Sequence, residues 1–205
     1  FKYADESLIE STHNSSGIIS KISGKKFHGS LARCTGDALF TAADIAIMFN
    51  LPGLNHELAS IATSKSAMRK FSRENNIKVP HGIRVSSCED FRAQEFDNQI
   101  IIKPDFTVIG KKSIAKVDSS DFAKVNNAIE SALLASGNEY VEVEDFIEGY
   151  DCSYLAWIEN GISTTLLTWD ELIGFNEAHN LFQFGVSTPS ISLTEDQGDR
   201  ITRVL

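Results

Sequence analysis

Hydrophobic side chains recur at helical spacing in the first third of the chain. One such stretch follows Gly36 and Asp37, a typical helix start, and ends before Pro52, which keeps the preceding residue out of the helical conformation. Its apolar positions are Leu39, Ala42, Ala43, Ala46 and Ile47. A second helical stretch is predicted from about 55 to 76. Its basic positions are Lys65, Arg69, Lys70 and Arg73.

The middle of the chain alternates between predicted strands and predicted helices. Three short apolar runs typical of strands lie at 82–87, 99–104 and 113–117. Ser87 and Asp90 have the spacing of a capping box, which predicts a short helix between the first two strands. Residues 120–136 place apolar side chains on one helical face, and Gly137 is placed to end that helix.

In the last third, hydrophobic and polar residues alternate with a period of two, which indicates strands. The Asn160-Gly161 pair predicts a hairpin turn between two of them. Thr194 and Gln197 form another capping box, which predicts a terminal helix. The order of elements predicts an α/β protein, more closely described as α+β.

The amino-acid composition and net charge limit the class of protein and its expected partners. The chain has 205 residues, of which 42% are hydrophobic and 23% charged, values typical of globular proteins and not of disordered ones. With 28 acidic and 19 basic residues its net charge is −9, a poor match to nucleic acid or to an anionic membrane. No apolar run approaches the ~18 to 20 residues needed to cross a bilayer. We therefore expect a cytoplasmic protein with no nucleic-acid or membrane partner.

Cysteine and histidine positions point to no metal or disulfide chemistry. Cys34, Cys88 and Cys152 are far apart and form no CxxC motif, so neither a disulfide framework nor a zinc knuckle is predicted. The five histidines show no pairing at metal-ligand spacing. The chain begins with Phe1 instead of Met and stops within a predicted helix, so we expect it to be part of a longer product.

Four short segments carry the groups that a nucleoside triphosphate requires. Lys65, Lys103 and the basic turn at 110–113 offer ammonium and backbone N–H groups to phosphate oxygens. The strand at 141–151 offers backbone groups to an adenine edge and carboxylates to ribose hydroxyls. Their occurrence together predicts a nucleotide site.

Each segment taken alone also has an ordinary interpretation. Lys103 would be a surface lysine after a strand, and the turn at 110–113 a plain hairpin connection that lacks the GxxxxGK[ST] pattern. Glu142 and Glu144 would form the solvated side of an amphipathic strand, and Asp151 would be a turn residue.

The order of these motifs resembles that of the ATP-grasp ligases, over roughly residues 31–205. The run LPGLNHELASIATSKSAMRKFSRENNIKVP is similar to the family segment that carries the first phosphate-contacting lysine, here Lys65. IIIKPD is similar to the segment that carries the second lysine, Lys103, and EDFIEGYD to the hinge strand that holds adenine.

The resemblance implies a role for each matching residue. Lys65 and Lys103 would clamp the phosphates, with Lys103 on the α-phosphate and adenine side. The adenine contacts would come from Glu144, Asp145, Phe146 and Ile147, and the ribose contact from Asp151. The loop over the phosphates would be Gly110, Lys111, Lys112 and Ser113. The family usually has Gly-Ser-x-Gly in this loop, so this chain has lost a glycine and with it some freedom for close backbone approach.

The resemblance also implies a division of the chain. Residues 1–58 would be the remnant of a preceding Rossmann-like α/β domain, and 59–205 an ATP-grasp region. Within that region we expect a small mobile αβ lid at about 78–140 and the start of an antiparallel-sheet subdomain at 141–205. The ligands for the Mg²⁺ of the family are expected beyond Leu205, and no metal ligand is assigned within the chain.

The implied function is ATP-dependent ligation of a carboxylate to an amine through an acylphosphate, as in carbamoyl-phosphate synthase and amino-acid-ligase-like enzymes. The expected partners are ATP, Mg²⁺ and small-molecule carboxylate and amine substrates, with an amino acid as one substrate candidate; a homodimer is compatible with this function. Two alternatives stay open. One is a non-catalytic nucleotide-binding or interaction module derived from such an enzyme, which the altered loop favours. The other is an ordinary α/β domain that binds no nucleotide.

Overall fold

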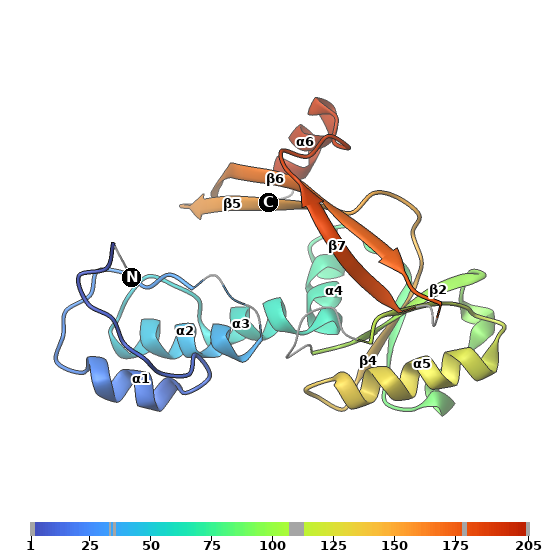
Figure 1. Cartoon of the computed structure of the whole chain (residues 1–205), viewed down its shortest axis with the longest axis horizontal. Coiled ribbons are helices and arrows are strands. Elements are labelled where there is room, and N and C mark those ends of the chain that lie inside the picture. The colour runs from blue at the N-terminus through green and yellow to red at the C-terminus, as the bar shows by residue number, and fades with distance from the viewer. Residues whose placement is uncertain (1–2, 33, 35, 107–112, 178–179, 204–205) are drawn as a thin grey trace.

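The computed structural model describes residues 3–32, 34, 36–106, 113–177 and 180–203. It consists of a helical N-terminal part, a four-stranded sheet with its covering helix, and a three-stranded sheet followed by a short helix (Figure 1). All strand pairs are antiparallel. The prediction of mixed helices and sheets is therefore confirmed, with antiparallel sheets. No helix in the described ranges has the length and apolar character needed to span a bilayer.

The N-terminal part is helical. Its helices are α1 (Ser15–Ile22), α2 (Asp37–Met48) and α3 (His56–Thr63). The α2 helix packs on both neighbours, and Leu39 and Ala43 of α2 form a small core with Ala59 of α3. Among the described residues of the segment 1–58 there is no strand. Its origin in a Rossmann-like domain stays a prediction.

The helix predicted over 55–76 is wrong as a single element. The chain breaks at Ser64, which has extended backbone angles of φ −100° and ψ 123°, and a new helix, α4 (Lys65–Glu74), begins at the next residue. The physical reason is capping: the Ser64 hydroxyl accepts a hydrogen bond from the Ala67 N–H at 3.1 Å. The break turns the N-terminus of α4 toward the four-stranded sheet, where Ser64 forms a β-bridge with Phe106.

The four-stranded sheet has the order β1-β4-β2-β3. Its strands are β1 (Gly82–Val85), β2 (Gln99–Pro104), β3 (Ala115–Asp118) and β4 (Val141–Asp145). The 3₁₀ turns η1 (Cys88–Asp90) and η2 (Ala93–Glu95) link β1 to β2. The predicted strand over 82–87 ends early because the Asp90 carboxylate accepts from the N–H groups of Ser86 and Ser87 and turns the chain.

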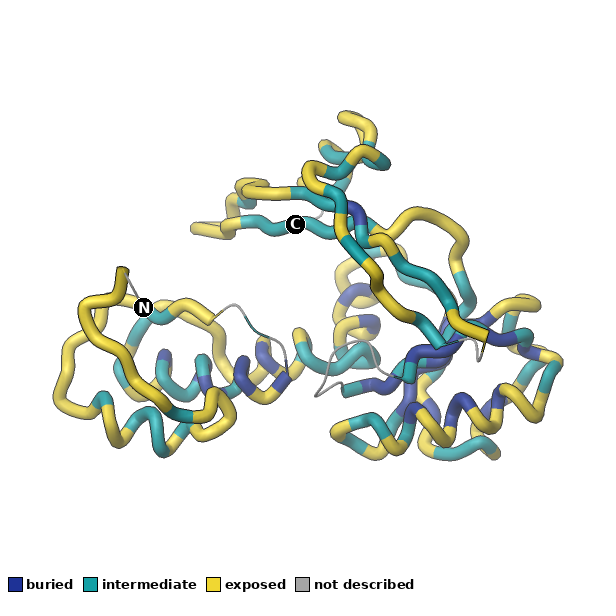
Figure 2. Tube along the Cα trace, in the orientation of Figure 1, coloured by how far each residue is buried: buried dark blue, intermediate teal, exposed yellow. Residues whose placement is uncertain are grey.

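One face of this sheet is covered by α5 (Phe122–Ala135). Val125 and Ile129 of α5 are fully buried against Ile100 and Ile102 of β2, and the buried positions gather between this helix and the sheet (Figure 2). The apolar periodicity that predicted this helix therefore corresponds to its buried side. This αβ layer falls within the residues predicted as a lid, and its role as a lid stays a prediction.

The second sheet contains β5 (Cys152–Glu159), β6 (Ile162–Phe175) and β7 (Leu181–Ser187), followed by α6 (Glu195–Thr202). The hairpin turn at Asn160-Gly161 is confirmed, with φ of 52° and 75° at the two residues. This second sheet lies above α4 and contacts the segment just before β3 through the start of β7, where the Leu181 N–H donates to the Ile114 carbonyl at 2.8 Å (Figure 1).

Candidate functional site

The end of β2 and the start of α4 meet at Asp105. This side chain is 1% exposed and accepts hydrogen bonds from the Ser66 N–H at 2.7 Å and from the Asn138 amide at 2.8 Å. The Ser64 hydroxyl lies 3.0 Å from the same carboxylate. Asp105 thus joins three segments that are distant in the sequence: β2, the cap of α4, and the connection between α5 and β4.

The environment of Asp105 favours its charged form. Burial raises the pKa of the carboxyl, but the hydrogen bonds from the Ser66 N–H and from Asn138 outweigh burial, so the pKa lies below its ordinary value. The carboxylate also sits at the N-terminus of α4, where unpaired backbone N–H groups favour negative charge. Sequence reasoning assigned no role to Asp105, because its partners come from elsewhere in the chain.

Lys65, Lys103 and Glu144 line one cavity of about 560 Å³. Lys65 is the first residue of α4, Lys103 is near the end of β2, and Glu144 is near the end of β4. The fold therefore brings together the two lysines and the first hinge residue that the sequence predicted for one nucleotide site. Val79 and Pro80 add apolar wall to the same cavity.

The two lysines of this cavity have negatively polarised partners. The Lys103 ammonium forms an ion pair with Glu144. The Lys65 ammonium lies 3.4 Å from the Asp105 carbonyl oxygen. Burial lowers the pKa of Lys65 below its ordinary value, and the positive charge of the nearby Lys103 adds to this effect. An anionic group entering between the two ammonium groups would favour the charged form of Lys65.

Arg69, which sequence reasoning counted only as part of a basic helix face, is buried at the same cavity. It forms an ion pair with Glu142 and lies 4.0 Å from Glu144. Glu142 is fully buried and Glu144 is 9% exposed, so the interpretation of these two glutamates as a solvated strand face is wrong. In the sequence, the sign of this arrangement is the spacing of these residues. Arg69 lies one helical turn after Lys65, and Glu142 and Glu144 lie two positions apart on one face of a strand.

The other predicted hinge residues do not line this cavity. The Asp145 carboxylate accepts from the Asp97 N–H, just before β2, at 2.9 Å. The Phe146 ring lies under the Lys116 ammonium at 3.8 Å and contacts Phe175 of β6 edge-on, so it joins the two sheets. Ile147 is 66% exposed and Asp151 is also exposed.

The predicted phosphate loop is only partly described. Gly110, Lys111 and Lys112 lie outside the described residues. Ser113 has φ 54°, and its hydroxyl accepts from the Ser131 hydroxyl of α5 at 3.2 Å. Ile114, the next residue, lines the cavity. The described chain therefore reaches the cavity at Ile114, directly after Ser113.

No metal site is found among the described residues, which contain no group of three or more His, Cys, Asp or Glu side chains placed to hold an ion. Among the described residues that line the cavity, the carboxylate is that of Glu144, and it is paired with the Lys103 ammonium. These residues do not fit a Mg²⁺ site.

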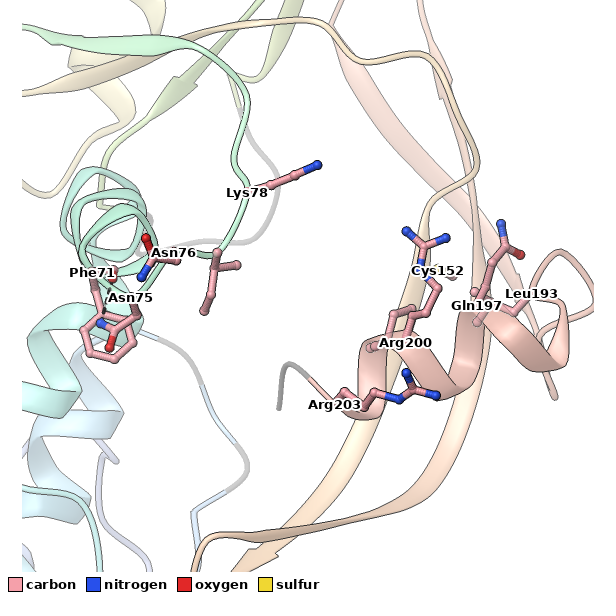
Figure 3. Close-up of a pocket in the computed structure, with 11 residues that line it drawn as sticks. Phe71, Asn75, Asn76, Lys78, Cys152, Leu193, Gln197, Arg200 and Arg203 are labelled. Carbon is pink, nitrogen blue, oxygen red and sulfur yellow. Dashed lines mark hydrogen bonds between the residues drawn. The ribbon is translucent and has the colours of Figure 1, made fainter.

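A larger cavity, of about 1060 Å³, lies at the opposite end of α4. Lys78 lies on one wall, and Arg200, Arg203 and Gln197 lie on the facing wall near Cys152 (Figure 3). None of the described residues predicted for nucleotide binding lines it. The predicted site and this larger cavity are therefore separate.

Comparison with known proteins identifies the fold. No protein-family model and no curated protein matches the sequence. Among solved structures, L-amino acid ligase from Bacillus licheniformis matches with a TM-score of 0.71 at 17% identity, covering 94% of this chain and 43% of that chain. Phosphoribosylglycinamide synthetase from Anaerococcus prevotii matches with a TM-score of 0.67 at 18% identity, covering 98% and 49%.

A third match is D-alanine–D-alanine ligase from Bacillus anthracis complexed with ATP, with a TM-score of 0.64 at 16% identity, covering 92% of this chain and 60% of that chain. The chain thus spans about half the length of the solved structures that it matches. The chain has the ATP-grasp fold of these ligases, and the resemblance read from its motifs is confirmed at the level of the fold.

Proposed function

We propose that this chain binds ATP in the cavity lined by Lys65, Lys103 and Glu144. The observation that carries the proposal is the meeting of these three side chains at one cavity within an ATP-grasp fold. Ammonium groups on two sides of a partly enclosed space suit phosphate oxygens, because charge-assisted hydrogen bonds strengthen where water is excluded. Lys111 and Lys112, which lie outside the described residues, would add further positive charge.

In this proposal Lys103 changes partner when nucleotide binds. Its ammonium is paired with Glu144, so a phosphate oxygen must compete with that carboxylate or share the ammonium, which carries three donors. Lys65 is held by the Asp105 carbonyl with the start of α4 fixed around it, so it stays in place. The expected result is a site in which the Lys103 ammonium changes its ion-pair partner while Lys65 keeps its place.

The adenosine end would lie along the strand end and loop after Glu144. The N–H groups of Asp145 and Phe146 already donate to the carbonyls of His81 and Gln99, so the adenine edge would meet the other backbone groups of Asp145, Phe146 and Ile147. The exposed Asp151 would accept from ribose hydroxyls. Asp145, Phe146 and Ile147 follow the lining residue Glu144 directly, so in this proposal a ligand extending out of the cavity passes along them.

For the whole protein we propose ATP-dependent ligation of a carboxylate to an amine, with the segment 1–58 as part of a preceding domain and about 78–140 as a closing lid. The carboxylate oxygen attacks the γ-phosphorus and ADP leaves; the amine nitrogen then attacks the acyl carbon, inorganic phosphate leaves and the nitrogen gives up a proton. This chemistry requires no protein nucleophile, because positioning and charge neutralisation dominate phosphoryl transfer. The contribution of this chain would be Lys65 and Lys103 at the phosphates.

Titration calorimetry of the chain with ATP, adenosine and inorganic triphosphate tests the proposal. We expect one ATP per chain, bound more tightly than adenosine or triphosphate, because only ATP meets both the lysines and the strand after Glu144. Absence of ATP binding, or equal binding of ATP and triphosphate, would contradict the proposal.

The ion pair between Lys103 and Glu144 also favours a second candidate, a module that binds nucleotide without turnover, because a lysine already neutralised stabilises phosphate charge less. Release of ADP, measured with a panel of carboxylates and amines, separates the two candidates. ADP formed only when both a carboxylate and an amine are present supports the ligase, and ATP binding without ADP formation supports the module.

A further inference from the structure

A buried ion pair links α4 to β4, the strand that leads into the predicted hinge. Glu142 of β4 is fully buried, and its carboxylate forms an ion pair with the guanidinium of Arg69, which is 8% exposed. Arg69 is therefore the main source of neutralisation for a carboxylate that has left water entirely. A buried carboxylate without such a partner is strongly unfavourable.

The backbone of β1 leaves room for Arg69. Gly82 faces the end of the Arg69 side chain, and a Cβ atom at Gly82 would meet the guanidinium and would lie 2.7 Å from the Val143 carbonyl oxygen. Any larger residue here would displace the arginine. The lack of a side chain at Gly82 thus leaves room for Arg69 over the face of the sheet where β1 pairs with β4.

Arg69 also reaches the second glutamate of the strand. One of its guanidinium nitrogens lies 4.0 Å from Glu144, and Glu144 pairs in turn with Lys103. Glu144 is therefore shared between two cations, and both of these cations line the cavity of about 560 Å³. A carboxylate shared in this way attracts each of its two partners less strongly than it would attract one alone.

We propose that Arg69 is a positioning residue for Lys103: by sharing the charge of Glu144 it leaves the Lys103 ammonium available to a phosphate oxygen of the nucleotide. This inference rests on the proposed ATP site. Without Arg69, Glu144 holds Lys103 alone, and the phosphate has to displace a stronger ion pair. The loss falls on the phosphate end of the ligand, and adenosine, which has no phosphate, is bound as before.

Two variants separate this role from a structural one. Arg69→Met alone leaves Glu142 buried and unpaired, so it is combined with Glu142→Leu, because apolar pairs of similar volume often replace buried ion pairs without loss of stability. Arg69→Lys keeps a positive charge for Glu142, but its compact ammonium cannot serve two carboxylates as a planar guanidinium does. Thermal unfolding establishes that each variant is folded.

The readout is the ratio of ATP affinity to adenosine affinity, measured by titration calorimetry. We expect Arg69→Met/Glu142→Leu to bind ATP at least tenfold more weakly than the unmodified chain and adenosine within about twofold, and Arg69→Lys to lower the ratio in the same direction. If the double variant does not fold, the ratio of ATP affinity to adenosine affinity is measured for Arg69→Lys alone.

One outcome would overturn the positioning role of Arg69, and another would overturn the proposed ATP site itself. An unchanged ratio in the folded variants, with ATP and adenosine affinities both retained or both lost, overturns the positioning role. If the unmodified chain itself binds no ATP, the proposed function fails first, and the two failures are told apart by that control.

Discussion

Lys103→Met is expected to weaken ATP binding about 30-fold, which corresponds to about 2 kcal/mol for a hydrogen bond between charged groups. The methionine keeps most of the apolar stem and removes only the ammonium, which at this site lies between Glu144 and the cavity. The neighbouring Arg69, 4.0 Å from Glu144, remains to neutralise that carboxylate. The loss therefore reports the missing phosphate contact, and titration calorimetry measures it.

The matched control for this variant is Lys124→Met. Lys124 lies on α5, pairs with Asp121 at 3.1 Å on the surface, and lines none of the cavities described above. Its replacement is expected to leave the ATP affinity within about twofold, since exposed ion pairs contribute little. Equal ATP affinities for Lys103→Met and Lys124→Met would show that Lys103 does not contact the nucleotide.

Asp105→Ala is expected to lower the free energy of unfolding by about 3 kcal/mol. The variant removes the acceptor for the Ser66 N–H, the Asn138 amide and the Ser64 hydroxyl at a position that is 1% exposed, and it leaves those donors unsatisfied. The helix α4 also loses a negative charge at its N-terminus. Urea unfolding monitored by circular dichroism measures the change.

Asp118→Ala is the control for Asp105→Ala. The Asp118 carboxylate also accepts from a backbone N–H, that of Ser120 at 2.9 Å, but this bond is exposed at the end of β3. Its replacement is expected to change the free energy of unfolding by less than about 1 kcal/mol. A loss for Asp105→Ala no larger than the loss for Asp118→Ala would contradict the central place of Asp105 in the fold.

The stabilisation that Asp105 provides is expected to decrease at low pH, because its pKa is lowered in the folded chain. The pKa is lower in the folded chain than the ~3.9 of an unfolded chain, so the folded state favours the carboxylate. The stabilisation is present in full above the unfolded pKa and is lost as the pH falls through the folded pKa. The difference in unfolding free energy between the unmodified chain and Asp105→Asn is therefore expected to shrink below about pH 4.

Local patterns in the sequence predicted the helices and strands well. They predicted the contacts between residues far apart in the sequence poorly. The strand over 99–104 and the capping boxes at Ser87 and Thr194 are confirmed, because each depends on residues close in the chain. The break at Ser64 was missed, because apolar spacing continues across it and only the carboxylate of Asp105, 41 residues away, shows why the helix restarts there.

At the candidate site, motif order likewise predicted several residues, whereas the pairing of side chains from distant segments was not predicted. Lys65, Lys103 and Glu144 were predicted from motif order and meet at one cavity, although they come from three different elements. The pairing of Arg69 with Glu142 was not predicted, because a helix face and a strand face that each look solvated in sequence become buried when they oppose each other. The roles of Ile147 and Asp151 stay predictions, since both are exposed outside the cavity.

The most direct test of the ATP site is photoaffinity labelling with an azido-adenine analogue of ATP, followed by mapping of the labelled peptide. We predict that the label falls on residues 141–151, which include Glu144 and the strand end beside the cavity, and that excess ATP prevents it. Labelling that excess ATP does not reduce, or that falls at the separate cavity of Lys78 and Arg200, would contradict a nucleotide site at Lys65 and Lys103.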